Sequence, residues 1–285
     1  MHIKNYEELS IADNFMFCKV FSTRLDLSRE IIEIILDRKI KKVKSVVSEK
    51  TVQITSDAKS IRLDIFLDDE NGSVYDLEMQ VAKEEFLSKR ARYYQSLIDL
   101  ECLEKGASYD KLPDSIVIFI CHFDYFGLGL PVYAFENICG ENKELSLGDG
   151  TLKVVVNLTA DTSKSSDRVK NLFRYFSEGI ISDRFTEKLD AAVDKVRLHK
   201  EWKVEYMEWR ANEMRHSYEK EAAVEKASKE YLAKGREEMK AENREILEKL
   251  TGGKGAMELI AEGYDKEQVE FADKFIKDLL SAGKT

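Results

Sequence analysis

Hydrophobic and polar residues alternate along two neighbouring segments of the chain, 61–67 and 74–81. In each segment one side is apolar and the other side carries acids, which is the pattern of half-buried β-strands. The dipeptide Asn71-Gly72 lies between the segments and is typical of a tight hairpin turn. The pattern therefore predicts two antiparallel strands joined by a short loop.

The length of the loop decides which side chains meet across this hairpin. A two-residue Asn-Gly loop would pair Asp64 with Met79 and mix the two faces. A three-residue loop, 70–72, with its glycine in the left-handed conformation, pairs Asp64 with Glu78 and keeps the apolar sides together. We therefore predict that these two carboxylates face each other, with β-carbons roughly 5 Å apart.

Two like charges directly opposite each other destabilise a sheet unless a cation lies between them. Mg²⁺ is a suitable cation, because it prefers oxygen ligands and is often held by one or two carboxylates and a substrate phosphate. The alternative is that Asp64 and Glu78 are ordinary acids on a solvated face of the sheet. Spacing alone leaves both interpretations open.

The rest of the hydrophobic pattern predicts an α/β core. Residues 115–121 form an unbroken apolar run, which is typical of a central strand buried on both faces. The other expected elements are helices at 11–21, 28–38, 84–105 and around 169–176, and strands at 43–47, 132–136 and 152–157.

Composition changes after about residue 182. Residues 185–250 contain no proline and almost no glycine, and their pattern is helical throughout, with alternating charge over 220–249. The segment TGGKG at 251–255 predicts a flexible break before a last helix. We therefore expect three regions, 1–182, 183–250 and 251–285.

Composition also narrows the setting. The first eight residues are polar and no apolar run approaches about 18 residues, so we expect neither a secretory signal nor a membrane span. The four cysteines show no CxxC spacing and only four histidines accompany them, which argues against zinc and for a reduced, cytoplasmic protein.

The net charge of −9 is unfavourable for a protein that binds nucleic acid. Binding would need a local basic surface, and residues 37–62, which include Lys59 and Arg62, are rich in lysine and arginine. Lys89, Arg90 and Arg92 follow the acidic hairpin. The alternative for each of these residues is an ordinary solvated side chain.

Four stretches carry a family resemblance: LSIADNFMFCKVF (9–21), LEMQ (77–80), the basic, tyrosine-rich KRARYYQ (89–95) and KGASYDKLPDSIVIFIC (105–121). In this order they resemble the recombination-promoting nuclease / putative transposase family of the PD-(D/E)XK nuclease superfamily. The resemblance covers about the first 180 residues.

This resemblance implies a restriction-endonuclease-like α/β core, a mixed central sheet flanked by helices, followed here by a long α-helical C-terminal extension. It implies a Mg²⁺-dependent DNA endonuclease of the bacterial cytoplasm, linked to recombination or mobile elements and associated with the nucleoid when bound to DNA. Mn²⁺ is the alternative ion. The other hypothesis is a nuclease-fold protein that binds DNA or a partner through its C-terminal helices, which could also form a homo-oligomer.

The resemblance also implies roles for single residues. Asp64 and Glu78 would bind the metal together with the Met79 carbonyl. Gln80 stands where most of the superfamily has lysine and would orient the attacking water, whereas Lys89 or Arg92 would restore the missing charge.

Accessory roles are expected for several other residues, of which Asp13 matches the resemblance. Asp13 would assist the metal or, as an alternative, cap a helix. Gln95, expected on the exposed side of its helix, would contact the DNA backbone, and Arg62, Lys59 and Arg90 would bind DNA. One ring of the Tyr93-Tyr94 pair is expected in the core.

Overall fold

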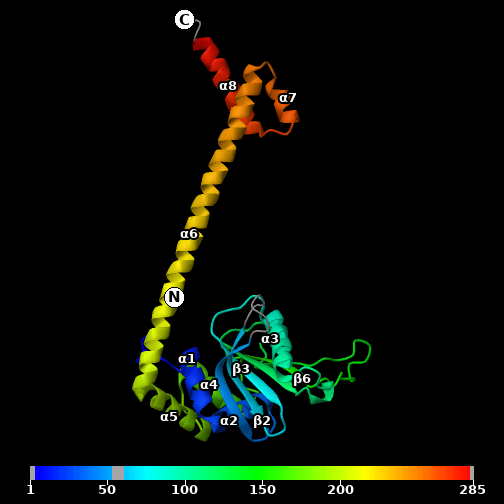
Figure 1. Cartoon of the computed structure of the whole chain (residues 1–285), viewed down its shortest axis with the longest axis vertical. Coiled ribbons are helices and arrows are strands. Elements are labelled where there is room, and N and C mark those ends of the chain that lie inside the picture. The colour runs from blue at the N-terminus through cyan, green and yellow to red at the C-terminus, as the bar shows by residue number, and fades with distance from the viewer. Residues whose placement is uncertain (1–3, 53–60, 283–285) are drawn as a thin grey trace. The chain divides into compact units, whose positions relative to one another are not determined.

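A computed structural model describes residues 4–52 and 61–282 (Figure 1). The chain divides into two compact units, Met1–Glu208 and Trp209–Thr285. The first unit contains the sheet, and the second is helical.

The first unit is built on a mixed six-stranded sheet. In spatial order its strands are β1 (Val43–Val52), β2 (Ile61–Asp69), β3 (Val74–Gln80), β4 (Ser115–Cys121), β6 (Thr151–Asn157) and β5 (Val132–Phe135). The first three strands are antiparallel, β3, β4 and β6 are parallel, and β5 runs antiparallel to β6. This arrangement confirms the predicted mixed sheet.

Strand β4 lies at the centre of the sheet, between β3 and β6. All seven of its residues are buried, and six of them are apolar. A strand covered on both faces cannot alternate apolar and polar side chains, which explains the unbroken apolar run.

The β2–β3 hairpin has the predicted register. Ile65 pairs with Leu77 and Phe66 with Asp76, so that one further step brings Asp64 opposite Glu78. The Asp69 amide donates to the Ser73 carbonyl at 3.0 Å, which leaves residues 70–72 as the loop. Gly72 has a φ of 83°, a conformation that favours glycine. The three-residue loop with a left-handed glycine is therefore confirmed.

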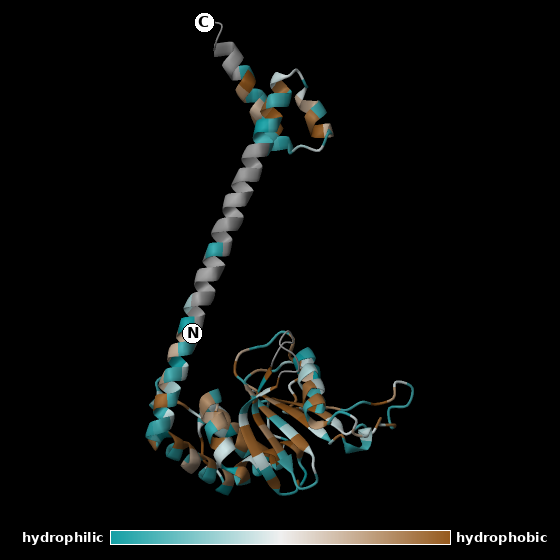
Figure 2. Cartoon of the chain, in the orientation of Figure 1, coloured by the Kyte–Doolittle hydropathy of each residue, from teal (hydrophilic) through white to brown (hydrophobic). Residues whose placement is uncertain are grey.

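Helices cover both faces of the sheet (Figure 1). Helix α3 (Leu87–Cys102) packs its apolar side on one face, where its residues share a core with β4. On the other face, α1 (Asn14–Thr23) contacts β1, β2 and β3, and α2 (Leu25–Leu36) contacts β1. Hydrophobic residues concentrate in the strands between these layers (Figure 2).

Two further helices complete the first unit, α4 (Asp167–Glu178) and α5 (Arg184–Leu198). Helix α5 begins at a capping box, in which the Asp183 side chain accepts from the Thr186 amide at 2.8 Å. A helix was expected throughout 185–250, but α5 ends at Leu198, His199 is extended, and α6 (Lys200–Thr251) follows. Short 3₁₀ turns occur at Tyr6–Glu8 and Tyr109–Lys111.

Residues after 182 pack with the first unit. Helix α5 contacts α1 and α2, and the Tyr6 hydroxyl donates to the Val196 carbonyl at 2.5 Å. The Tyr206 ring of α6 is buried, with its centroid 5.7 Å from that of Tyr6. The boundary at residue 182 stays a prediction, whereas this packing favours a later boundary, near residue 208.

Truncation tests this boundary. We expect a chain ending at residue 208 to unfold cooperatively with nearly the melting temperature that the first unit has in the full-length protein. A chain ending at 182 lacks α5 and therefore exposes the apolar side chains that α5 covers. Burial of each such side chain contributes about 1.5–3 kcal/mol, so this chain should be poorly soluble or lose cooperative unfolding. Calorimetry on both chains decides, and equal melting temperatures would support the earlier boundary.

The second unit contains the rest of α6 with α7 (Ala256–Ala261) and α8 (Lys266–Ala282). Ile246, Leu259 and Val269 form its small core. The glycine-rich break predicted before one last helix is followed by two helices, separated by Gly263, which has a φ of 102°. No helix within the described residues is long and apolar enough to cross a membrane.

Candidate active site

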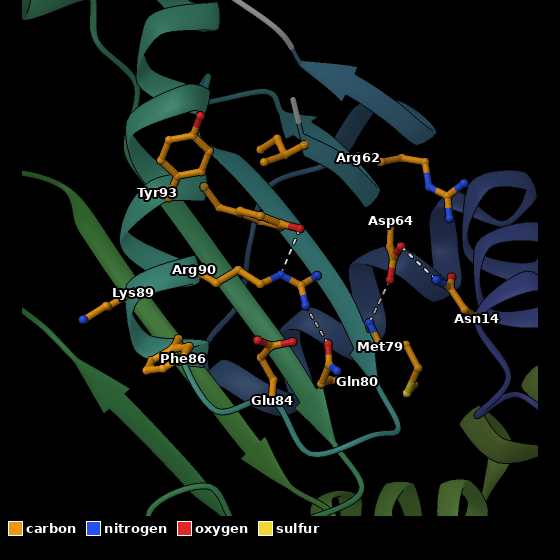
Figure 3. A pocket seen from close by; sticks show the side chains of 12 residues that line it. Asn14, Arg62, Asp64, Met79, Gln80, Glu84, Phe86, Lys89, Arg90 and Tyr93 are labelled. Atoms are coloured by element: carbon orange, nitrogen blue, oxygen red, sulfur yellow. Dashed lines mark hydrogen bonds between the residues drawn. The ribbon is translucent and has the colours of Figure 1, made fainter. Parts of the chain in front are cut away.

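A cleft of about 830 Å³ opens between the hairpin and α3 (Figure 3). Its walls come from α1, β2, β3, α3 and the turn before α3. The lining residues are Asn14, Ile61, Arg62, Asp64, Met79, Gln80, Glu84, Phe86, Lys89, Arg90, Tyr93 and Tyr94. The cleft therefore gathers residues from both sides of the acid-bearing hairpin.

Asp64 lies at the edge of this cleft with only 5% of its surface exposed. Its Oδ1 accepts from the Asn14 side-chain amide at 3.1 Å, and its Oδ2 accepts from the Met79 backbone amide at 3.1 Å (Figure 3). The sequence analysis predicted a role near the metal for the neighbouring Asp13 and none for Asn14, which contacts Asp64.

Glu78 is 1% exposed and makes two contacts. Its Oε1 accepts from the Asp64 backbone amide at 2.9 Å, and its Oε2 accepts from the Arg90 guanidinium at 2.8 Å. Asp64 and Glu78 are thus brought together as the register predicted. Because both are buried, the alternative of acids on a solvated face is excluded.

Asp76 is a third buried acid near this pair, and the sequence interpretation gave it no role. It is fully buried, and neither of its carboxylate oxygens has a hydrogen-bond partner among the described residues. Burial, and then the charge of Asp64, raise the pKa of Asp76 well above its ordinary value of 3.8. The Glu78 side chain and the charge of Arg90 oppose this shift.

The other two acids respond to burial in the same direction. Burial raises the pKa of Asp64, although its hydrogen bond from Met79 opposes the shift. Burial, followed by the charges of Asp76 and Asp64, raises the pKa of Glu78 well above 4.5. Burial therefore favours the protonated forms of these acids, and the charge of Arg90 opposes the shift at all three.

These shifts predict how stability depends on pH without metal. A raised folded-state pKa gives a stabilising contribution that is fully present below pH 4 and is lost as pH rises through the raised value. Melting temperature in EDTA should therefore fall for wild type relative to Glu78→Gln as pH increases from 5 to 8. If the melting temperatures of the two proteins changed equally with pH, this result would contradict the raised pKa of Glu78.

Arg90 forms an ion pair with the buried Glu78. Its guanidinium donates to Glu78, to Gln80 Oε1 at 2.8 Å and to the Tyr94 hydroxyl at 3.0 Å. It was expected to bind DNA, while Lys89 or Arg92 was expected to restore the charge that lysine supplies elsewhere in the superfamily. The structure instead brings Arg90 beside Gln80 (Figure 3).

The remaining basic residues lie in different surroundings. Lys89 lines the cleft with its Nζ 5.4 Å from the Phe86 ring centroid. Arg62 also lines the cleft, and its guanidinium lies 3.4 Å from a Glu49 carboxylate oxygen. Arg92 is exposed and is not part of the cleft lining. Lys59 lies outside the described residues.

Two expectations about accessory residues are corrected or narrowed. Gln95 was expected on the exposed side of α3, but it is 4% exposed and donates to the Ser115 carbonyl at 3.0 Å. The predicted exposure of Gln95 was wrong, because the side of α3 that carries Gln95 packs on β4. Asp13 pairs with Lys4 at 2.7 Å and does not line the cleft.

The donor chemistry of the site fits a divalent cation. No group of three or more histidine, cysteine, aspartate or glutamate side chains in the described part of the chain is arranged to hold a metal. However, Asp64 and Glu78 are adjoining oxygen donors, and Asp76 adds a third buried carboxyl group whose oxygens have no hydrogen-bond partner among the described residues. Asp64 and Glu78 would hold such an ion.

Residues 12–127 match the family model of the PD-(D/E)XK nuclease family transposases. The matched segment runs from just before α1 to just after β4. The matched segment contains Asp64, Glu78, Gln80 and Arg90, and the six-stranded mixed sheet with flanking helices is a restriction-endonuclease-like core. No curated protein and no solved structure matches the chain significantly.

The match to the PD-(D/E)XK nuclease family transposases supports a nuclease-like or transposase-like function. PD-(D/E)XK nucleases usually use divalent metals, and a nuclease family implies a DNA substrate. The acids and the cleft are compatible with both requirements.

Proposed function

We propose that this protein is a Mg²⁺-dependent DNA endonuclease that acts in recombination or in the transfer of mobile elements. The observation that carries this proposal is the buried pair Asp64 and Glu78, in which the Asp64 backbone amide donates to Glu78 at 2.9 Å and Asp64 lines an open cleft. Burying two acids is costly, and such arrangements are concentrated at functional sites.

Asp64 and Glu78, with the Met79 carbonyl, would hold Mg²⁺ in this proposal. A bound ion supplies Lewis acidity toward water and toward the scissile phosphate. Arg90 contributes the positive charge that a superfamily lysine would bring, and its contact with Gln80 directs that charge into the cleft.

Gln80 acts as a positioning residue in this scheme. Its Nε2 donates to the Ala82 carbonyl at 2.8 Å, while its Oε1 accepts from Arg90. The side chain is therefore fixed at both ends, and Arg90 is held between Gln80 and Glu78.

A supercoiled-plasmid assay tests the proposed reaction. Wild type should convert supercoiled to nicked plasmid with Mg²⁺ and, as the alternative ion, Mn²⁺, and EDTA should stop the conversion. Persistent absence of nicking with either ion, in protein that binds the ion by calorimetry, would contradict the proposal.

The second candidate function is binding of DNA or a partner by a nuclease-fold protein through its C-terminal helices. A groove of about 220 Å³ in the second unit favours it, because two exposed rings, Phe271 and Phe275, line the groove. These helices could also mediate self-association. Binding that requires Phe271, in a protein without nuclease activity, would support this function.

Gln80→Ala should reduce nicking roughly 10- to 100-fold while Mg²⁺ affinity stays within about twofold, because the variant loses one hydrogen bond to a charged group. Both carboxylates remain in place. Nicking rates measured beside calorimetric Mg²⁺ titrations separate the two effects. Wild-type cutting by Gln80→Ala would show that Gln80 does not position Arg90 for the reaction.

A further inference from the structure

Two aromatic rings border the cleft on the side of α3. Phe86 is 53% exposed and Tyr93 is 36% exposed, and both line the cleft beside Arg90 (Figure 3). They are seven residues apart, which corresponds to about two helical turns and roughly 10 Å along the helix axis. Both rings therefore lie within reach of one short stretch of a polynucleotide.

Cations accompany these rings. Lys89 lies over the Phe86 ring, and Arg62 lines the opposite wall of the same cleft. Asp64 and Glu78 are recessed behind this rim, because they are 5% and 1% exposed and Glu78 contacts Arg90, whereas Glu84 is a half-buried acid of the lining. Positive charge at the rim complements the phosphates of a DNA strand.

The size of the cleft exceeds what a metal ion and one phosphate would fill. Its volume of about 830 Å³ is within the range of about 300–1,000 Å³ typical of sites for small organic molecules. A nucleoside, with its flat base and sugar, is a molecule of this class. The aromatic rings supply the flat apolar surface that a base would contact.

An exposed aromatic ring in a charged groove distinguishes between paired and unpaired DNA. Bases inside a duplex are already stacked on both faces, so a side-chain ring can stack on a base only after that base leaves the duplex. Unpaired bases stack on aromatic side chains regardless of sequence, next to basic residues that follow the backbone.

We propose that the cleft binds an unpaired nucleotide of the strand to be cut, with its base stacked on Phe86 and the adjoining nucleotides directed toward Tyr93. The preferred substrate is then single-stranded or locally unpaired DNA rather than continuous duplex. This inference rests on the proposed endonuclease function, because it takes the bound strand to be the substrate. It concerns binding, however, which can be measured without cleavage.

Single exposed aromatic residues are common on protein surfaces and need no special explanation. Tyr109, which is 85% exposed and outside the cleft lining, is one of them. Phe86 and Tyr93 differ because they share a concave site with Lys89 and with the buried Asp64.

The test uses the full-length protein in EDTA, so that cleavage is absent and binding is observed alone. Short oligonucleotides carrying 2-aminopurine are compared as single strands and as duplexes of the same sequence. Stacking quenches the fluorescence of this base. We expect quenching with the single strand only, and binding of the single strand at least about tenfold tighter than of the duplex.

Phe86→Ala should weaken single-strand binding roughly 5- to 100-fold and remove the quenching, with little effect on the duplex. Phe86→Leu keeps an apolar side chain without a ring and should behave like Phe86→Ala, whereas Phe86→Trp should retain binding. Tyr109→Ala is the matched control and should match wild type. Melting curves of every variant establish that it is folded.

Equal binding of single strand and duplex, or unchanged quenching in folded Phe86→Ala, would overturn the inference. Plasmid nicking with Mg²⁺ is measured separately. A protein that nicks plasmid but shows no stacking contradicts this inference alone, whereas stacking without any nicking supports it and contradicts the endonuclease function.

Discussion

Asp64→Asn and Glu78→Gln are each expected to lower Mg²⁺-dependent plasmid nicking by about 1,000-fold or more. The size follows from losing a carboxylate ligand, because a bound ion contributes several kcal/mol to the stabilisation of transition-state charge and each 1.36 kcal/mol is tenfold in rate. Mg²⁺ affinity measured by calorimetry should fall together with the rate.

Amide variants test the role of the carboxylate charge with less structural disturbance than alanine variants. Asp64 accepts a hydrogen bond from the Met79 amide and Glu78 accepts one from the Asp64 amide. Alanine would leave these buried donors without partners, at a cost of about 1–3 kcal/mol each, whereas an amide oxygen can still accept.

The amide variants should keep or raise the melting temperature in EDTA, because each removes a buried charge from the acid cluster. Asp110→Asn, which changes a fully exposed acid, is the matched control for both activity and stability. A clear loss of metal-free stability in Asp64→Asn or Glu78→Gln would instead indicate that the acids have a structural role.

The hairpin and its register could be predicted because local features determine them. Alternation sets the two faces, and only a three-residue loop ending in a left-handed Gly72 keeps the apolar faces together. The apolar run of β4 identified the central strand for a similar reason, since burial on both faces leaves no polar positions.

The partner of Arg90 could not be predicted, because its contacts depend on tertiary packing. Lys89, Arg90 and Arg92 are chemically alike in sequence, and only the rotation of α3 on the sheet directs Arg90 toward Glu78. The same rotation buries Gln95 against Ser115. Helix periodicity indicates which positions share a side but not which polar residue faces a particular partner.

The sequence pattern also could not predict where the helices end near the C-terminal side of the first unit. Residues 185–250 have uniform helical propensity, yet the chain leaves the helix at His199, where the backbone becomes extended. The packing of α5 on α1 and α2 supplies no local sequence signal, so its place in the first unit emerges only from the structure.

Arg90→Met should destabilise the metal-free protein by about 3 kcal/mol at pH 8, near the lower end of the cost of breaking a buried ion pair, since Arg90 is 28% exposed. The variant leaves Glu78 buried without its cation. Nicking should fall at least about 100-fold, because the positive charge beside Gln80 is lost. Arg90→Lys keeps the charge but cannot contact Glu78, Gln80 and Tyr94 at once, and should be intermediate.

The matched experiment combines Arg90→Met with Glu78→Gln. If the stability loss comes from the unpaired carboxylate, the double variant should recover most of it, and so should lowering the pH of Arg90→Met toward 5, where Glu78 takes up a proton. Chemical denaturation of wild type, the two single variants and the double variant at pH 5 and pH 8 measures the coupling energy between Arg90 and Glu78. A loss independent of pH and of Glu78→Gln would mean that Arg90 stabilises chiefly by packing its guanidinium on the Tyr94 ring, 4.9 Å from the ring centroid.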